Sequence, residues 1–258
     1  SIQQNDTNKV KTLLLLVNEL RKYDPQVALQ YCNDAYILSK DLDYKTGELN
    51  SRLKQSYIFQ RMGKIDSAIL CIIDYKSLSE TVKDTERIAT SHFQLGNLLR
   101  SKGETYTAYD HFQVCLDLYK RINDTIGIIC AYISIGIIHK NLSEFDSAAY
   151  YYSKALEVSE QIGYEDGIGS SLISLGKIYI EIKDYQNAIN YLKRSIEFNQ
   201  RSGNIHDEAL AYENLGIIAD EENDQDKAME YYTKSLELNR QIKNEIQVNN
   251  LLNNIRIV

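Results

Sequence analysis

The chain has 258 residues, of which 43% are apolar and 25% charged, and its net charge is −7. This balance is typical of a soluble helical protein, and an acidic chain without a basic cluster is not expected to bind nucleic acid or an anionic membrane surface. The longest apolar stretch, around residues 126–138, is expected to be too short to span a bilayer, and no part of the given sequence is expected to act as a signal peptide. A single proline and the absence of tryptophan also favour helices over strands.

Alanine and glycine recur every forty residues without insertion or deletion. Six alanines form one column, and small residues form a second one through most of the chain. The first column is Ala28, Ala68, Ala108, Ala148, Ala188 and Ala228, and the second is Ser56, Gly96, Gly136, Gly176 and Gly216. A fixed period of this length predicts a repeat array that forms one quasi-linear domain.

In chain order, a degenerate first repeat at residues 5–43 precedes five full repeats. The full repeats are 44–83, 84–123, 124–163, 164–203 and 204–243, and residues 244–258 begin a seventh helix A or a cap. Each repeat is predicted to contain a helix A and a helix B. In the last full repeat these run from about 206 to 219 and from about 226 to 241. The next helix A is expected to be capped by a turn side chain, the candidates being Asp84, Asp124, Asn204 and Asn244.

Two apolar columns are predicted to form the core. The helix B column is Leu38, Leu78, Leu118, Val158, Phe198 and Leu238, and the helix A column is Leu95, Ile135, Leu175, Leu215 and Ile255. A glycine such as Gly216 costs a helix roughly 1 kcal/mol relative to alanine, so packing has to compensate for it. We expect the small residue to let helix A cross its own helix B at close backbone approach.

The last full repeat carries a recognisable motif. Leu215-Gly216 in helix A, then a turn, then Ala228, Tyr232 and Ser235-Leu236 in helix B resemble the tetratricopeptide repeat. The resemblance covers nearly the whole chain, although its forty-residue period exceeds the thirty-four residues common in that family. It implies an all-α, right-handed superhelix, an α-solenoid of antiparallel helix pairs, whose concave face of A helices binds a protein or peptide.

The first segment has a narrower likeness. Residues 6–47, with Asp24-Pro25 opening a helix, look like the start of the repeat region at the N-terminus of membrane signalling proteins of Bacteroidetes-type bacteria. That resemblance implies a sensor region on the periplasmic face of a membrane-anchored protein with a histidine kinase, cyclase or DNA-binding output, as in two-component systems. Because the chain begins at Ser1, we expect it to be excised from a longer protein. The alternative is a cytoplasmic scaffold or regulator that binds a partner protein.

No catalytic set is expected. The histidines His92, His111, His139 and His206 are interpreted as lying in different repeats without the i, i+4 spacing of a metal pair. The four cysteines show no C-x-x-C spacing, and a disulfide between Cys115 and Cys130 is left open. The acidic turn 220–224 lacks the central glycine of a calcium loop. We therefore predict no catalytic residue, no metal and no cofactor.

The polar face of the A helices is the candidate binding site. Its residues are Asn50, Lys54, Tyr57, Arg61, Gln94, Asn97, Arg100, Ser134, Lys140, Ser174, Lys177 and Asn214. The three cations Arg100, Lys140 and Lys177 could hold a carboxylate, and the amides could bond an extended peptide backbone. An ordinary solvated surface remains an equal alternative. The lysine and asparagine clamp of co-chaperone repeats is not reproduced.

The last helix leaves its apolar residues Leu251, Leu252, Ile255 and Val258 without a following helix B. An uncovered solenoid end needs a cap. Three alternatives stay open: the helix caps the array, the chain continues, or the end forms a homodimer. As a whole, the sequence predicts a non-catalytic binding module in which a ligand alters the stacking of the repeats.

Overall fold

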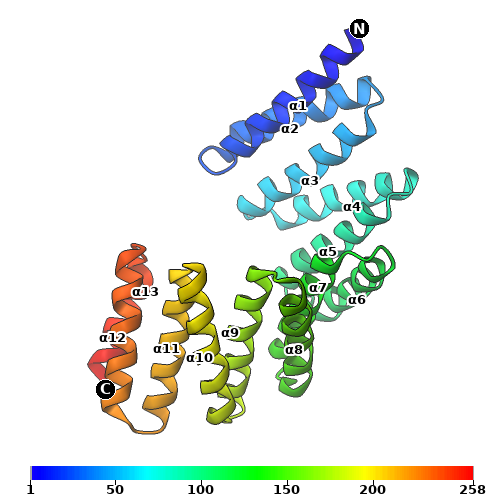
Figure 1. Cartoon of the computed structure of the whole chain (residues 1–258). Helices are drawn as coiled ribbons and strands as arrows, with labels where there is room; N and C mark the ends of the chain where they lie inside the picture. The colour runs from blue at the N-terminus through cyan, green and yellow to red at the C-terminus, as the bar shows by residue number, and fades with distance from the viewer. Residues whose placement is uncertain (1, 258) are drawn as a thin grey trace. The chain divides into compact units, whose positions relative to one another are not determined.

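The structure is a computed structural model that describes residues 2–257, and side chains from 6 to 255. All regular structure in this range is α-helical, as predicted from the composition (Figure 1). The chain divides into two compact units, unit 1 at Ser1–Asp124 and unit 2 at Thr125–Val258. Unit 1 contains α1 (Ile2–Leu20), α2 (Pro25–Asp41), α3 (Lys45–Arg61), α4 (Ile65–Thr81), α5 (Thr85–Ser101) and α6 (Thr105–Arg121). That both units form one solenoid stays a prediction.

Unit 2 contains α7 (Thr125–Asn141), α8 (Phe145–Ile162), α9 (Glu165–Glu181), α10 (Tyr185–Ser202), α11 (Ile205–Glu221), α12 (Gln225–Gln241) and α13 (Glu245–Ile257). Within each unit every helix packs against the next one in the chain, and α1 also contacts α3, α7 contacts α9, and α9 contacts α11. The odd-numbered helices are the predicted A helices and the even-numbered ones the B helices. Each unit is thus a stack of helix pairs.

A left-handed residue marks each turn from α2 onward at intervals of twenty residues. The backbone φ is between 51° and 86° at Asp43, Gly63, Lys83, Gly103, Asn123, Ser143, Gly163, Lys183, Gly203, Asn223 and Lys243. A residue in this conformation ends one helix and redirects the chain into the next. The predicted caps are confirmed at Asp84, Asn204 and Asn244, whose side-chain oxygens accept from the backbone N–H three residues later at 3.0, 3.2 and 3.3 Å.

The glycine column faces large side chains of helix B. A Cβ on Gly96 would lie 2.6 Å from the Phe112 ring, and one on Gly216 would lie 2.5 Å from the Tyr232 ring. An added side chain would therefore force helix B away from helix A, and the atoms that it would meet belong to a helix B side chain. The space of the missing Cβ is filled by an aromatic ring, which is fully or almost fully buried at both positions.

The predicted helix A seam is confirmed at Leu95, Ile135, Leu175 and Leu215, which are all buried, whereas its last member, Ile255, is half-buried. The predicted helix B seam from Leu38 to Leu238 is only half-buried. The fully buried column lies one residue later and consists of Ser39, Ser79, Tyr119, Ser159, Asn199 and Asn239. Its serine hydroxyls donate to the carbonyl four residues earlier, which satisfies them inside the helix at 2.6 to 2.7 Å.

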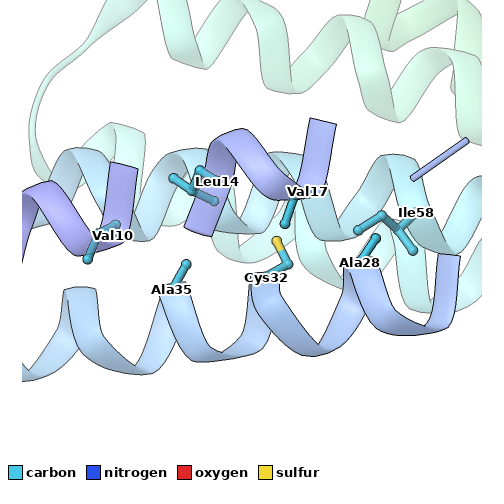
Figure 2. Close-up of a cluster of buried hydrophobic side chains, with 7 residues drawn as sticks. All are labelled: Val10, Leu14, Val17, Ala28, Cys32, Ala35 and Ile58. Atoms are coloured by element: carbon cyan, nitrogen blue, oxygen red, sulfur yellow. The ribbon is translucent and has the colours of Figure 1, made fainter. Parts of the chain in front are cut away.

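Buried apolar clusters join successive helices within each unit. Figure 2 shows the first of them, in which Val10, Leu14 and Val17 of α1 face Ala28, Cys32 and Ala35 of α2, with Ile58 from α3. At the other end of the chain, Leu251 of α13 is fully buried against residues of α11 and α12 that include Tyr232. This packing fits the capping alternative for α13. Val258 lies outside the described residues, and the homodimer stays a prediction.

Candidate binding face of the A helices

The predicted site residues of unit 1 bond to the neighbouring A helix. The Lys54 ammonium on α3 donates to the Asn18 side-chain oxygen on α1, and Arg87 on α5 donates to Asn50 on α3 at 3.1 Å. Each bond spans about one repeat along the chain. The polar side chains that could receive a ligand also hold consecutive repeats in register.

Tyr57 and Arg61 continue this pattern toward the C-terminal end of α3. The Gln94 amide on α5 donates to the Tyr57 hydroxyl at 3.2 Å, and the Arg61 guanidinium donates to the backbone carbonyl of Lys22 at 3.1 Å. A pocket of about 400 Å³ opens beside these contacts. We call it the basic pocket, and it is lined by Arg21, Lys22, Tyr57, Gln60 and Arg61.

Three of the pocket residues, Arg21, Lys22 and Gln60, are absent from the predicted site. The signal that identifies Arg21 lies in the repeat itself, because it stands one forty-residue step before Arg61. The predicted polar face begins at Asn50 in the second repeat, although the alanine column already extends into the first repeat at Ala28.

Asn97 and Arg100, the other two predicted site residues of unit 1, differ in their hydrogen bonding. Asn97 turns its amide inward and donates to the carbonyl of Phe93 at 3.2 Å, within its own helix. Arg100 is half-buried, and its Nε is buried with no hydrogen-bond partner among the described residues. A buried guanidinium N–H without an acceptor is costly, and the Arg100 Nε is too buried for a ligand to reach it in this conformation.

In unit 2 the predicted residues range from buried to exposed. Ser134 and Asn214 are 6% and 5% exposed, and the Asn214 amide donates to Leu210 within its own helix. Ser174 and Lys177 are half-buried, and Lys140 is exposed. Ser134 and Asn214 therefore offer little surface to a ligand, and Lys177 offers more.

Lys177 and Glu213 are two half-buried residues of opposite charge that interact electrostatically. Burial lowers the pKa of Lys177, the charge of Lys140 lowers it further, and Glu213 opposes both effects. Burial likewise raises the pKa of Glu213, which accepts a hydrogen bond from Gln247 on α13 at 2.6 Å. Desolvation disfavours the charged ammonium of Lys177 and the charged carboxylate of Glu213. Charged groups at binding sites are often destabilised in this way.

Charge is distributed unevenly between the units. The 29 basic and 36 acidic residues of the chain divide into 17 and 16 in unit 1, and into 12 and 20 in unit 2. The negative net charge thus belongs to unit 2, while unit 1 is close to neutral and carries the basic pocket.

The prediction that the four histidines lie in four different repeats is wrong for two of them. His92 on α5 and His111 on α6 belong to the same repeat, and their Nδ1 atoms lie 3.0 Å apart, so one donates to the other. Burial lowers the pKa of His92 to about 4, assisted by Lys76 and His111. His139 stacks on Tyr151 and approaches Glu144 at 2.6 Å. Among the described residues no group of three or more potential ligands could hold a metal ion.

Cys32 and Cys71 are free thiols. Cys32 is fully buried and donates to the carbonyl of Ser51 at 3.2 Å, and burial raises its pKa to about 12. Burial also raises the pKa of Cys71. Both thiols are therefore protonated at neutral pH and are poor nucleophiles.

In the part of the chain that the structure describes, no helix has the length and apolar character needed to cross a bilayer.

Known structures resemble this one in fold. The quorum sensor NprR of B. thuringiensis superposes with a TM-score of 0.75 at 12% identity, covering 98% of this chain and 70% of that chain. The signal transduction ATPase PH0952 of Pyrococcus horikoshii, described as having a tetratricopeptide repeat sensor, gives 0.73 at 17% identity, covering 96% and 42%. At these identities the likeness concerns the fold alone.

A sequence relative matches a short part of the chain. The transcriptional activator NprA of Geobacillus stearothermophilus is 36% identical over 63 residues, which are 24% of this chain and 15% of that protein. The chain therefore spans a small part of the relative that it matches.

The family model of the tetratricopeptide repeat matches residues 87–161, 127–201 and 167–241. Together these ranges cover residues 87–241, more than half of the chain, and they step by one forty-residue repeat. With the stacked helix pairs and the glycine and alanine columns described above, the chain belongs to the tetratricopeptide repeat family.

Proposed function

We propose that this chain is a non-catalytic module of a bacterial signalling protein that binds a protein or peptide through the A-helix face. The observation that carries the proposal is the incomplete pairing of polar groups on that face. The Arg100 Nε lacks an acceptor among the described residues, and Lys177 is half-buried at a site where desolvation disfavours its charge. A ligand carboxylate would supply a partner for the Lys177 ammonium, and at Arg100 a ligand would have to approach the other guanidinium nitrogens, because the Nε is buried.

The absence of catalysis is proposed from the chemistry of the reactive side chains. The thiols of Cys32 and Cys71 are held protonated, and His139 is engaged by an aromatic ring and a carboxylate. A nucleophile needs a nearby base and a lowered pKa, and neither thiol has the latter.

The signalling role has support from the proteins of similar fold, whose names include a quorum sensor and a repeat sensor. Two settings remain as proposals. The first is the extracytoplasmic sensor region of a membrane-anchored two-component-type protein, as the likeness of the N-terminal segment implies. The second is a cytosolic regulator that captures a partner protein.

Replacing Arg100, Lys140 and Lys177 together by alanine tests the binding face. The wild type should retain a ligand from lysate of the source cells, and the triple variant should lose it with an unchanged circular dichroism spectrum. Lys154, Lys193 and Lys234 lie on B helices, so their triple alanine replacement is the matched control. Equal retention by both variants would remove the A-helix face from consideration.

Cell fractionation separates the two settings. An antibody against this segment should detect a membrane-bound band much larger than 29.7 kDa that external protease trims in spheroplasts, if the segment is an extracytoplasmic sensor region. A protected band in the soluble fraction would instead establish the cytosolic regulator.

A further inference from the structure

We infer that the basic pocket of unit 1 binds a carboxylate group of the ligand, so that the partner is an acidic peptide or a peptide with a free C-terminus. The inference rests on the proposed function and adds to it the anchoring site and the chemistry of the ligand. It concerns a part of the A-helix face at the C-terminal ends of α1 and α3.

The cations of the basic pocket are not paired within the protein. Arg21, Lys22 and Arg61 form no ion pair with a carboxylate among the described residues, and the one hydrogen bond between pocket residues joins Arg61 to the Lys22 backbone. Elsewhere in unit 1, Lys45 and Lys102 do pair with acidic side chains at 2.8 and 3.0 Å. Each of three other surface pockets is lined by at least one aspartate or glutamate, whereas the basic pocket has none.

The surroundings of the pocket confirm an uncompensated positive field. Burial lowers the pKa of Lys54, and the charge of Arg21 lowers it further. Burial raises the pKa of Tyr57, and Arg21 opposes that rise. No carboxylate acts on either group, so the fold holds several cations together without a counter-charge, and an anion would bind there favourably.

Stabilisation of helix ends does not account for the whole set. Arg61 lies in the last turn of α3 and Arg21 directly follows α1, where a cation interacts favourably with the helix dipole. Tyr57 and Gln60, however, are uncharged and gain nothing from the helix dipole. The Tyr57 hydroxyl accepts from Gln94, and because a hydroxyl is also a donor, this pocket residue has an O–H that a ligand could accept. Two guanidinium groups, an ammonium, a hydroxyl and the Gln60 amide form a donor set that suits a carboxylate.

The residues of the A-helix face outside the basic pocket favour a peptide ligand over other anions. Beyond the pocket the amides Asn50, Gln94 and Asn97 of the A helices accompany two guanidinium groups, Arg87 and Arg100, and each amide already makes one hydrogen bond within the protein. Neutral amides suit a peptide backbone, whereas a nucleic acid needs repeated phosphate contacts. The carboxylate itself could be a chain terminus or an aspartate or glutamate side chain.

The test uses the complete 258-residue chain and two peptide libraries. Each library has nine randomised residues, one with a free C-terminal carboxylate and the other with a C-terminal amide. Peptides retained by the immobilised protein are sequenced, and the best of them is titrated calorimetrically into the wild type, into R21Q/R61Q and into R121Q/R240Q. Arg121 and Arg240 lie in the last turns of the B helices α6 and α12, so this control makes the same charge change at equivalent helix ends.

We expect retained peptides to be acidic in both libraries or to come from the free-carboxylate library alone, and these two results distinguish a side chain from a terminus. R21Q/R61Q should weaken binding at least about 10-fold, since the variant loses the charge-assisted hydrogen bonds of two guanidinium groups. The control should bind as the wild type does, and thermal melting should show all three folded. Unchanged affinity of R21Q/R61Q would overturn the inference and leave the proposed function standing. If the folded wild type retains no peptide from either library, the proposed function itself fails.

Discussion

The Tyr232 ring occupies the space that a side chain at Gly216 would need, with 2.5 Å between its nearest atom and an added Cβ. The same relationship recurs one repeat earlier each time, between Gly176 and Leu192 and between Gly136 and Tyr152, at 2.7 Å. The forty-residue glycine column is thus matched by a column of large residues on helix B. Packing between helices A and B of one repeat explains why glycine persists within a helix.

Gly216→Ala should destabilise the protein, although alanine is the better helix former. The methyl group would overlap a buried ring, and overpacking of this kind costs about 1–3 kcal/mol, which exceeds the gain of about 1 kcal/mol in helix propensity. Urea unfolding of the variant should show a lower midpoint.

Gly169→Ala is the matched control for that experiment. Gly169 also lies inside an A helix of unit 2, but the nearest atom to an added Cβ is 3.5 Å away, at the Asp207 carboxylate. This change should raise the free energy of unfolding by about 0.5–1 kcal/mol. Equal effects of the two substitutions would contradict the packing explanation.

The turns give a second stability prediction. Gly103 has a φ of +86° and no atom within 4 Å of an added Cβ, so Gly103→Ala carries a backbone penalty alone, about 1–2 kcal/mol. Gly103→Asn should cost less, because asparagine tolerates the left-handed region and already occupies it at Asn123 and Asn223. The two variants are compared by thermal unfolding, and an alanine that is no worse than asparagine would refute this explanation.

The cysteines give a third prediction, which addresses the bond left open by the sequence. In urea without reductant, a thiol reagent should titrate four thiols per chain, because the structure records no disulfide among the described residues. Under native conditions Cys130, which is half-buried, should react before Cys32, whose thiol has a pKa of about 12. Two thiols instead of four in urea would show that Cys115 and Cys130 are bonded.

The repeat, the helix pairs and the helix A seam were all accessible from the sequence, because a column of identical residues reports on the same packing position in every unit. The helix B seam was misplaced by one residue. Ser39, Ser79 and Ser159 look solvent-facing in the sequence, yet each is fully buried and satisfied by its own helix. Apolar periodicity alone does not identify a buried serine, since its partner is a backbone carbonyl.

The binding face was predictable only in part. Lys54, Tyr57 and Arg61 follow from helix periodicity, and Arg21 follows from the forty-residue step once the first repeat is included. The side-chain rotamer decides which acceptor each amide bonds to. Asn97 and Asn214 donate within their own helices, whereas Gln94 donates to a residue of the neighbouring repeat. That distinction depends on the distance between A helices, which the sequence does not specify.

The third repeat has two histidines at positions where the fourth repeat has two tyrosines. His92 and His111 occupy the positions that Tyr132 and Tyr151 occupy in the following repeat, and their rings lie 5.0 Å apart. Lys76 on α4 adds a positive charge beside both rings, and Asp110 opposes it at His111. Burial is the largest cause of the lowered pKa at both histidines.

Stability should therefore fall as the pH falls from about 6.5 toward 4. An unfolded histidine titrates near 6.5, whereas folded His92 has a pKa of about 4, so between these values the unfolded chain binds more protons. The loss is complete below the folded pKa, and partial solvent exposure limits it to about 1–2 kcal/mol. The double variant His92→Tyr with His111→Tyr restores the tyrosine pair of the neighbouring repeat. Its melting temperature should vary less between pH 7 and pH 5 than that of the wild type, and an identical pH dependence would exclude the histidine pair as the cause.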